Sequence, residues 1–423
     1  MTDFDAIKAF LSNSIDDSRD LLIHTTRKLV QAASPNPPGN LSVAAAAAVQ
    51  LIKENIPVAD ISLHETSPGV VNVIATVKGS RPGKTLVFSG HLDTYPTGDN
   101  AQWTVPAFEG RVSDDMSRLY GRGAADMKGG IAASLVAIRA MAQQREAWDG
   151  QIVLALAGDE ETMGSLGTMW LLDRIDMVKN ADAAIVGDAG TPLIVRTGEK
   201  GLVWLEIRAI GKAAHGAHVH RGVNAIERLM GAIGCIKDLE KLNIRGPDEI
   251  VQVIEHATPI SEKFAGPGEA DVLRRITVNL GTICGGTSMN LIPDSAQARL
   301  DIRLPYGITT DELLGLVRDR LEPLQGISFH VTQRYDPTWT SQSEDIVKCA
   351  LRAAQDVIGP EAVLNMRVGA SDARLYRQRG IPTVVVGLSP YNMGGPDEYC
   401  LIEELMQVAR IHALTAFHFL KRE

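Results

Sequence analysis

The chain has 423 residues and a formal net charge of −9, with 45% hydrophobic and 22% charged residues. This length suggests two domains of a soluble globular protein, and the negative charge argues against nucleic acids or anionic membranes as partners. Four scattered cysteines without a CxxC pair, no secretory signal and no apolar run of roughly 18 residues predict a cytoplasmic protein with reduced thiols.

The N-terminal part of the chain alternates between helical and strand-like patterns. Residues 4–33 have helical spacing, and the segment 34–39, which is rich in proline and ends in glycine, stops that helix. The alanine run 44–48 predicts a closely packed helix. Strand-like and helical runs then alternate up to about residue 197, which predicts a largely parallel sheet covered by helices.

The pattern changes after residues 197–201. A strand (202–210), a helix (224–242), two strands (275–284 and 296–304), a helix (310–321) and a strand (327–334) follow in order. This βαββαβ order is typical of a ferredoxin-like α+β domain. We therefore expect an inserted domain at 200–335, and a first domain made of residues 1–199 and 336–423, whose sheet regains a strand at 383–387.

Four short segments of the first domain carry acidic or histidine residues. They contain His91 and Asp93, then Asp126, then Glu160 and Glu161, and finally Asp188. Three of the segments follow apolar strand-like runs, and ligands of open α/β sheets bind at the carboxyl ends of strands. Carboxylates crowded at one sheet edge repel one another unless protons or cations compensate, and a divalent metal is the obvious compensator.

Each segment alone also has an ordinary interpretation. His91 and Asp93 could be solvated residues at a strand end. The glycines around Asp126 could shape a turn or a phosphate loop, although an acidic residue would then point at the phosphate. Glu160 and Glu161 could form a polar turn, or one could bind metal while the other moves protons. The four segments in this order together favour the metal site.

With these segments, the chain resembles the metallohydrolases that include aminoacylase, acetylornithine deacetylase, succinyl-diaminopimelate desuccinylase and glutamate carboxypeptidase. The resemblance implies a zinc-exopeptidase-like catalytic domain with a mostly parallel sheet, plus the inserted domain as lid or dimerisation domain. It implies that His91 and Asp188 bind one metal, that Asp126 bridges two metals, that Glu161 binds the second metal and that Glu160 is the general base.

The resemblance extends to residues outside the metal ligands. Asp93 matches the carboxylate that orients the bridging ligand, and His215 matches a histidine that reaches a partner subunit's active site. A metal cluster of His215, His218 and His220 is the weaker interpretation, because they follow a strand of the other domain. Arg303 could also be a salt-bridged residue of its strand. The positions that match substrate-binding residues are Asn290, Arg303, Ser371 and Arg374.

One position departs from the family pattern. A histidine is expected four residues before Glu398, but Gly394 stands there, and no histidine occurs between His330 and His412. The second metal site therefore lacks its nitrogen ligand, which predicts one metal per active site. Residues that could substitute are Tyr391, Asn392 and Asp397.

These observations predict a hydrolase that uses Mn²⁺, Zn²⁺ or Co²⁺ to cleave a carbon–nitrogen bond, by default an amide, in a small carboxylate-bearing substrate. Metal-activated water would attack, Glu160 would move the proton, and His215 would stabilise developing negative charge. An aminohydrolase that releases ammonia from an electron-poor aromatic compound such as 5-nitroanthranilate, and an inactive binding protein, are the alternatives. We expect a homodimer or higher homo-oligomer formed through the inserted domain.

Overall fold

The computed structural model describes residues 3–422, which divide into two compact units. Unit 1 comprises Met1–Thr197, Trp339–Asn365 and Ser371–Glu423, and unit 2 comprises Gly198–Thr338 and Met366–Ala370. Unit 2 thus also takes five residues, 366–370, from the segment that we assigned to the first domain. Among the described residues, no helix is both long and apolar enough to cross a membrane.

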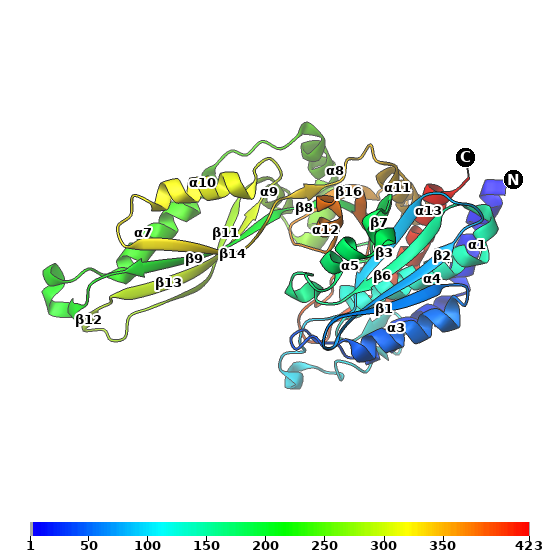
Figure 1. The fold of residues 1–423 in the computed structure, drawn as a ribbon, viewed down its shortest axis with the longest axis horizontal. Helices are drawn as coiled ribbons and strands as arrows, with labels where there is room; N and C mark the ends of the chain where they lie inside the picture. The colour runs from blue at the N-terminus through cyan, green and yellow to red at the C-terminus, as the bar shows by residue number, and fades with distance from the viewer. Residues whose placement is uncertain (1–2, 423) are drawn as a thin grey trace. The chain divides into compact units, whose positions relative to one another are not determined.

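Unit 1 contains a nine-stranded sheet with the order β1-β2-β6-β3-β7-β17-β8-β15, in which β16 pairs with β8 (Figure 1). The central strands β6, β3, β7 and β17 run parallel. Strand β1 pairs antiparallel with β2, β2 with β6, and β8 with β17. The strands are β1 (Asp60–Ser67), β2 (Val70–Lys78), β3 (Thr85–His91), β6 (Gln151–Ala157), β7 (Ala183–Val186), β8 (Ile194–Glu199), β15 (Thr338–Trp339), β16 (Val363–Arg367) and β17 (Thr383–Val385). A small separate sheet contains β4 (Arg111–Val112), β5 (Arg118–Tyr120) and β18 (Tyr399–Leu401).

Helices cover both faces of this sheet because its central strands are apolar on both sides. Val87 packs in one core cluster with residues of α5, α6 and α12, whereas the neighbouring Phe88 lies 5.6 Å, between ring centroids, from His412 of α13. The helices of unit 1 are α1 (Asp3–Asp16), α2 (Arg19–Gln31), α3 (Ser42–Asn55), α4 (Gly129–Gln143), α5 (Thr168–Arg174), α6 (Asp176–Lys179), α11 (Asp345–Ile358), α12 (Ala373–Gln378) and α13 (Ile402–Leu420).

The helix expected over 4–33 is in fact two helices. They are separated at Asp17 and Ser18, where the Ser18 hydroxyl donates a 2.6 Å hydrogen bond to the Ser14 carbonyl. Serine side chains compete in this way with the backbone bonds of a helix.

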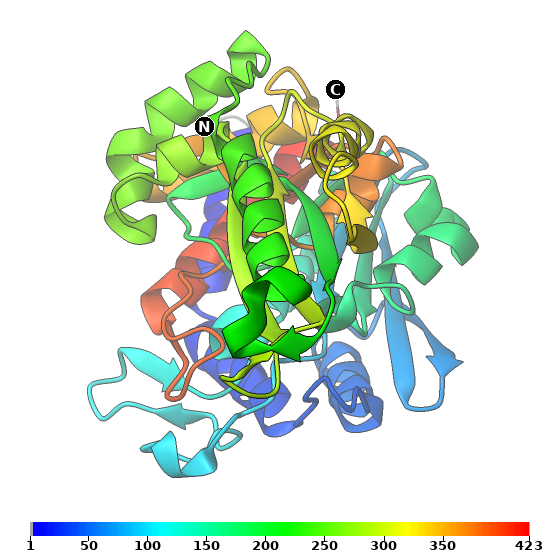
Figure 2. The ribbon, with the colours of Figure 1, turned by 90° about the vertical axis from the view of Figure 1, so that its left-hand side faces the viewer.

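Unit 2 has the predicted ferredoxin-like arrangement. Its antiparallel sheet has the order β11-β13-β9-β14, and α7 and α10 pack on it through one hydrophobic core. Figure 2 shows α7, in green, lying over this sheet. The elements are β9 (Gly201–Ile210), α7 (Ala225–Lys237), β11 (Thr277–Gly285), β13 (Ser295–Leu304), α10 (Thr310–Leu321) and β14 (Ile327–Tyr335), with a two-stranded ribbon of β10 (Ala214–His215) and β12 (Leu291–Ile292). The predicted fold class is confirmed.

Two helices of unit 2 were not predicted. Helix α8 (Asp248–Ala265) and helix α9 (Glu269–Arg274) lie between α7 and β11 in the chain. Helix α8 buries one narrow face, which includes Ile250 and Ile254, and it contains Pro259. An interior proline usually interrupts a helix, so the sequence pattern here did not indicate one.

Candidate metal centre and catalytic residues

His91, Asp126 and Asp188 lie together and are buried. His91 is the last residue of β3 and Asp188 follows the neighbouring parallel strand β7, so both side chains lie at the same sheet edge. Asp126 lies in the turn before α4, and its Oδ1 is 3.3 Å from Nε2 of His91. One ligand atom from each of the three residues lies within 4.8 Å of the other two. The structure thus brings together the three residues predicted for the first metal.

Two glycines set the distance between the turn before α4 and the end of β7. A Cβ on Gly130, in the first turn of α4, would lie 1.9 Å from the carbonyl oxygen of Gly187. Any side chain at Gly130 is therefore excluded, and the two backbones are in direct contact. This contact lies next to Asp188 and four residues after Asp126 in the chain.

Glu160 and Glu161 form a second group around the same histidine. They follow β6, which pairs in parallel with β3 so that Ala157 is opposite His91. Glu160 Oε2 is 4.0 Å from His91 Nε2, and ligand atoms of His91, Glu160 and Glu161 lie within 4.8 Å of one another. His91 therefore belongs to both groups.

Asp93 is fully buried and holds the loop that carries the two glutamates. Its carboxylate accepts hydrogen bonds from the backbone amides of Glu160 (3.3 Å) and Glu161 (3.1 Å) and from the side chain of Asn36 (2.9 Å). Its Oδ1 is also 3.5 Å from His91 Nδ1. Asn36, which the sequence analysis missed, lies in the proline-rich segment that we interpreted only as a helix stop.

The electrostatics of the two groups fit a divalent cation. Burial, followed by the negative charge of Asp126, raises the pKa of Glu161 to about 9. Burial alone would lower the pKa of His91, but hydrogen bonds to Asp126 and Asp93 outweigh it and raise that pKa well above 6.5. Glu161 Oε1 is buried and has no hydrogen-bond partner among residues 3–422. The raised pKa values mean that Glu161 and His91 bind protons in place of a cation. A divalent cation that binds there would displace these protons, so the donor set suits a metal.

A buried ion pair supports the turn that carries Asp126. Glu398 Oε2 is 2.5 Å from Arg122 Nη1, and both side chains are only 1% exposed. The other oxygen, Oε1, accepts hydrogen bonds from the backbone amides of Gly123 (3.0 Å), Ala125 (3.0 Å) and Asp126 (3.2 Å). We had used Glu398 only to position Gly394, so its role as a support of the metal-site turn was missed.

The residues considered as replacements for the missing histidine are engaged elsewhere. Tyr391 stacks on Tyr399 and donates to Glu404, and Asp397 accepts from the backbone amide of Thr104. Asn392 donates to the backbone carbonyl of Asp397. Of the three, Asp397 is absent from both groups around His91 within the described part of the chain.

Tyr95 is the side chain nearest to the place where the histidine is missing. A Cβ on Gly394 would lie 3.9 Å from Cδ2 of Tyr95, with no closer atom within reach. The negative charge of Glu161, followed by burial, raises the pKa of the Tyr95 hydroxyl. Tyr95 therefore faces the second group from the side of Gly394.

Ser371 and Arg374 are buried in unit 1. The Arg374 guanidinium donates to the carbonyl oxygens of Ser371 (2.7 Å) and Met163 (2.8 Å), which ties α12 to the loop after Glu161. Between them, Asp372 accepts a 2.6 Å hydrogen bond from Thr168, and its negative charge contributes, after burial, to the raised pKa of Glu160. Asp372 is a further residue near the site that the sequence analysis did not select.

The remaining predicted residues belong to unit 2. His215 and Asn290 adjoin, because β10 pairs with β12 and the Gly216 amide donates to the Asn290 carbonyl at 2.7 Å. Both side chains are exposed. Arg303 does not join them, since it lies near the other end of β13, roughly 25 Å along the strand from Ser295. Its guanidinium pairs with Asp301 at 2.9 Å, as in the salt-bridged alternative.

Comparisons with known proteins place this geometry in a family. The profile of the peptidase family M20/M25/M40 matches residues 87–418, a span that contains all the metal-site residues described above. The chain belongs to the M20 peptidase family. This M20 chain is 28% identical over 397 residues to the succinyl-diaminopimelate desuccinylase of Paracoccus denitrificans, covering 92% of this chain and 95% of that protein. It is 31% identical over 366 residues to the desuccinylase of Granulibacter bethesdensis, covering 82% and 86%.

Solved M20 structures share the fold over nearly the whole chain. A metallo-carboxypeptidase from Sulfolobus solfataricus superposes with a TM-score of 0.78 at 21% identity, covering 94% of this chain and 99% of that one. A dinuclear metal-binding M20 peptidase from Bacillus subtilis superposes with a TM-score of 0.66 at 15% identity, covering 96% and 99%. The expected family and fold are confirmed, and this M20 protein is a metal-dependent hydrolase of carbon–nitrogen bonds.

Proposed function

We propose that this enzyme hydrolyses the amide bond of a small carboxylate-bearing molecule, such as an N-acyl amino acid, with Glu160 as general base. The position of Glu160 carries the proposal. Its carboxylate lies 4.0 Å from His91 Nε2, beside the buried group of His91, Asp126 and Asp188. The desuccinylases that the chain resembles support an acylated amino acid as the substrate class.

The residues of the site have separate tasks. His91, Asp126 and Asp188 would hold the cation, for which we propose Mn²⁺, Zn²⁺ or Co²⁺, since one imidazole among oxygen ligands suits all three. A divalent cation in such a site supplies Lewis-acid catalysis, lowering the pKa of water and polarising a carbonyl oxygen. Glu160 Oε2 would take the proton of the attacking water and deliver it to the leaving nitrogen.

Asp93 would keep Glu160 in place, because it binds the backbone of Glu160 and of Glu161 from a fully buried position. A general base must stay within hydrogen-bond reach of the proton that it removes, so this anchoring supports the assignment. Glu161 would belong to a second, weakly occupied cation position, and we propose one metal per active site because Gly394 supplies no ligand.

The substrate's own carboxylate would be recognised by residues outside the metal site. For this we propose Ser371 and Arg374 of unit 1 and Asn290 and Arg303 of unit 2, with His215 stabilising developing negative charge. Arg303 is the weakest of these, since Asp301 already pairs with it. We further propose a cytoplasmic homo-oligomer that assembles through unit 2.

The test replaces Glu160 by glutamine, which is nearly isosteric and cannot accept a proton as a carboxylate does. We expect kcat to fall by roughly 10²–10⁴-fold on an N-acyl amino acid, while the metal content stays as in the wild type. Asp188→Ala is the comparison variant and should lose both metal and turnover. Loss of metal in Glu160→Gln would make Glu160 a ligand and move the base role to Glu161.

A substrate panel separates the amide hydrolase from the aminohydrolase. The panel contains N-acetyl and N-succinyl amino acids, including succinyl-diaminopimelate, together with aminoaromatic acids, and it is read by amine and ammonia release. Turnover of acyl amino acids supports the proposal. Ammonia release from an aminoaromatic acid with no turnover of the amides would contradict it.

A further inference from the structure

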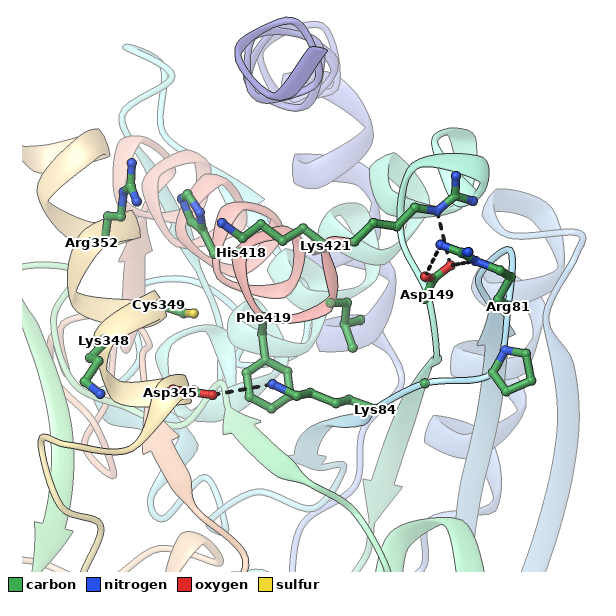
Figure 3. A pocket seen from close by; sticks show the side chains of 14 residues that line it. Arg81, Lys84, Asp149, Asp345, Lys348, Cys349, Arg352, His418, Phe419 and Lys421 are labelled. Atoms are coloured by element: carbon green, nitrogen blue, oxygen red, sulfur yellow. Dashed lines mark hydrogen bonds and ion pairs between the residues drawn. The ribbon is translucent and has the colours of Figure 1, made fainter. Parts of the chain in front are cut away.

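A basic hollow lies at the opposite edge of the unit 1 sheet from the metal-site residues. It has a volume of about 860 Å³ and is formed by the loops before β3 and β6 together with α11 and the end of α13 (Figure 3). Lys84, at its rim, immediately precedes β3, and His91 ends that strand. Seven residues of extended chain separate the two edges by roughly 20 Å, so the hollow is not part of the substrate site.

The side chains that line the hollow carry a marked excess of positive charge. Six Lys and Arg side chains and two Asp side chains face it, an excess of four positive charges in a chain whose net charge is −9. The cationic residues are Arg81, Lys84, Lys348, Arg352, Lys421 and Arg422. Such a concentration of one sign in a concave surface attracts ligands of the opposite sign.

The two aspartates, Asp149 and Asp345, form ion pairs with three of these six cations. Asp149 accepts from Arg81 (2.9 Å) and Arg422 (3.2 Å), and Asp345 pairs with Lys84 at 3.4 Å. Lys348, Arg352 and Lys421 make no ion pair with any described side chain, although Lys421 Nζ lies over the Phe4 ring, 5.0 Å from its centroid. Figure 3 shows the first two on α11 at one side and Lys421 at the end of α13.

A buried histidine of α13 provides a second, independent observation. His418 lines the hollow, is 6% exposed, and its Nε2 makes no hydrogen bond within residues 3–422; the nearest acidic atom is Asp356 Oδ2 at 3.7 Å. Burial, then the positive charges of Arg352 and Lys8, lower the pKa of His418 to about 4, although Asp356 opposes them. A buried polar atom that makes no hydrogen bond within residues 3–422 therefore lies among more positive than negative charges.

We propose that this hollow binds a small molecule that carries two phosphate groups. Each phosphate monoester has a charge of about −1.5 to −2 at neutral pH, so two of them match the four excess positive charges. Arg352 and the paired Arg81 and Arg422 offer the planar donor geometry that phosphate oxygens accept, while Lys348 and Lys421 act as point charges. The volume is within the range of sites for small ligands.

Titration calorimetry at physiological salt tests the site: fructose 1,6-bisphosphate is titrated into the metal-loaded enzyme. Combining Lys348→Glu, Arg352→Glu and Lys421→Glu should weaken binding at least 100-fold, since each charged contact contributes about tenfold or more. All three residues are exposed, so the variant should fold. Its turnover of an acyl amino acid should equal that of the wild type.

The matched control carries Lys28→Glu, Lys53→Glu and Lys179→Glu. These are three exposed lysines of unit 1 away from the hollow, and the change in net charge is the same. It should bind the bisphosphate as the wild type does. Equal weakening in the control, or no binding of the bisphosphate by the wild type at millimolar concentration, would overturn the proposal.

Two further ligands define the chemistry of the site. Glucose 6-phosphate, with one phosphate, should bind at least tenfold more weakly than the bisphosphate. Tricarballylate, a tricarboxylate, should also bind more weakly. Tighter binding of either one would contradict the assignment of two phosphate groups.

Discussion

Replacing Glu398 by glutamine tests whether the turn that carries Asp126 depends on a residue far away in the sequence. The glutamine oxygen could still accept the amides of Gly123, Ala125 and Asp126. Its amide nitrogen, however, would face the Arg122 guanidinium, which has only donors. The substitution therefore removes the negative charge beside Arg122 and leaves that cation buried.

The structure sets the size of the expected effect. Glu398 and Arg122 are each 1% exposed and lie 2.5 Å apart. Breaking a buried ion pair from one side costs about 3–5 kcal/mol of folding free energy. Because Asp126 is held by the same carboxylate, metal affinity should also fall by roughly 10–100-fold, as for other residues that orient a ligand.

Two measurements check this expectation. Urea unfolding of the metal-free protein gives the change in stability, and calorimetric titration with Mn²⁺ gives the change in affinity. Glu404→Gln is the matched control: Glu404 is also buried in unit 1 but accepts from Ser389 (2.7 and 2.9 Å), and it pairs with no arginine among residues 3–422. It should lose about 1–2 kcal/mol of stability and keep its Mn²⁺ affinity.

A Glu398→Gln protein that loses less than about 1 kcal/mol of folding free energy and binds Mn²⁺ as the wild type does would refute a supporting role of Glu398. An equal loss of Mn²⁺ affinity in Glu404→Gln would also refute it, since the effect would then be general loosening of the fold. If Glu398→Gln is as stable as the wild type but binds Mn²⁺ more weakly, the Glu398 carboxylate positions the turn that carries Asp126 without contributing to folding stability.

Three further outcomes are expected. His412 is buried, and burial lowers its pKa from 6.5 to about 4. As the pH falls, the unfolded chain is therefore protonated at this histidine before the folded chain is. About 3 kcal/mol of folding free energy is lost between pH 6.5 and pH 4. Urea midpoints of metal-free His412→Gln should consequently fall less over this range than those of the wild type. Gly394→His should raise the metal content, measured by elemental analysis, from one to two ions per chain. The backbone angle φ of +76° at this position adds about 1 kcal/mol of strain for a histidine. An unchanged metal content would mean that a side chain at position 394 does not reach the second site. Mixing His215→Ala with Glu160→Gln subunits should restore activity if His215 acts across a dimer, and verified heterodimers without activity would exclude that role.

The part of the site that sequence could predict consists of residues that follow strands. His91 and Asp188 come after apolar runs, and parallel strands bring their carboxyl ends to one edge, so local patterns were sufficient. Asn36 meets Asp93 across 57 positions, and Glu398 meets Ala125 across 273. No periodicity or spacing indicates such a pairing. The ferredoxin-like order of unit 2 followed from alternating and helical patterns. Helix α8 was missed: it contains Pro259, and only two of its buried residues, Ile250 and Ile254, are large and apolar.

The contact between Gly130 and Gly187 has a consequence for how this enzyme can change. Two ligands of the proposed cation are carried by segments that meet through main-chain atoms, with no side chain between them. Their spacing is therefore insensitive to most substitutions in the surrounding pocket. Laboratory evolution towards new acyl groups should then accumulate changes in the loops and in unit 2 while positions 130 and 187 remain glycine. A library randomised at these two positions should return only glycine at 130, where a Cβ would lie 1.9 Å from the Gly187 oxygen, and mainly glycine at 187, where it would lie 3.0 Å from the Gly130 oxygen. The geometry of the cation site would then stay fixed while substrate recognition changes.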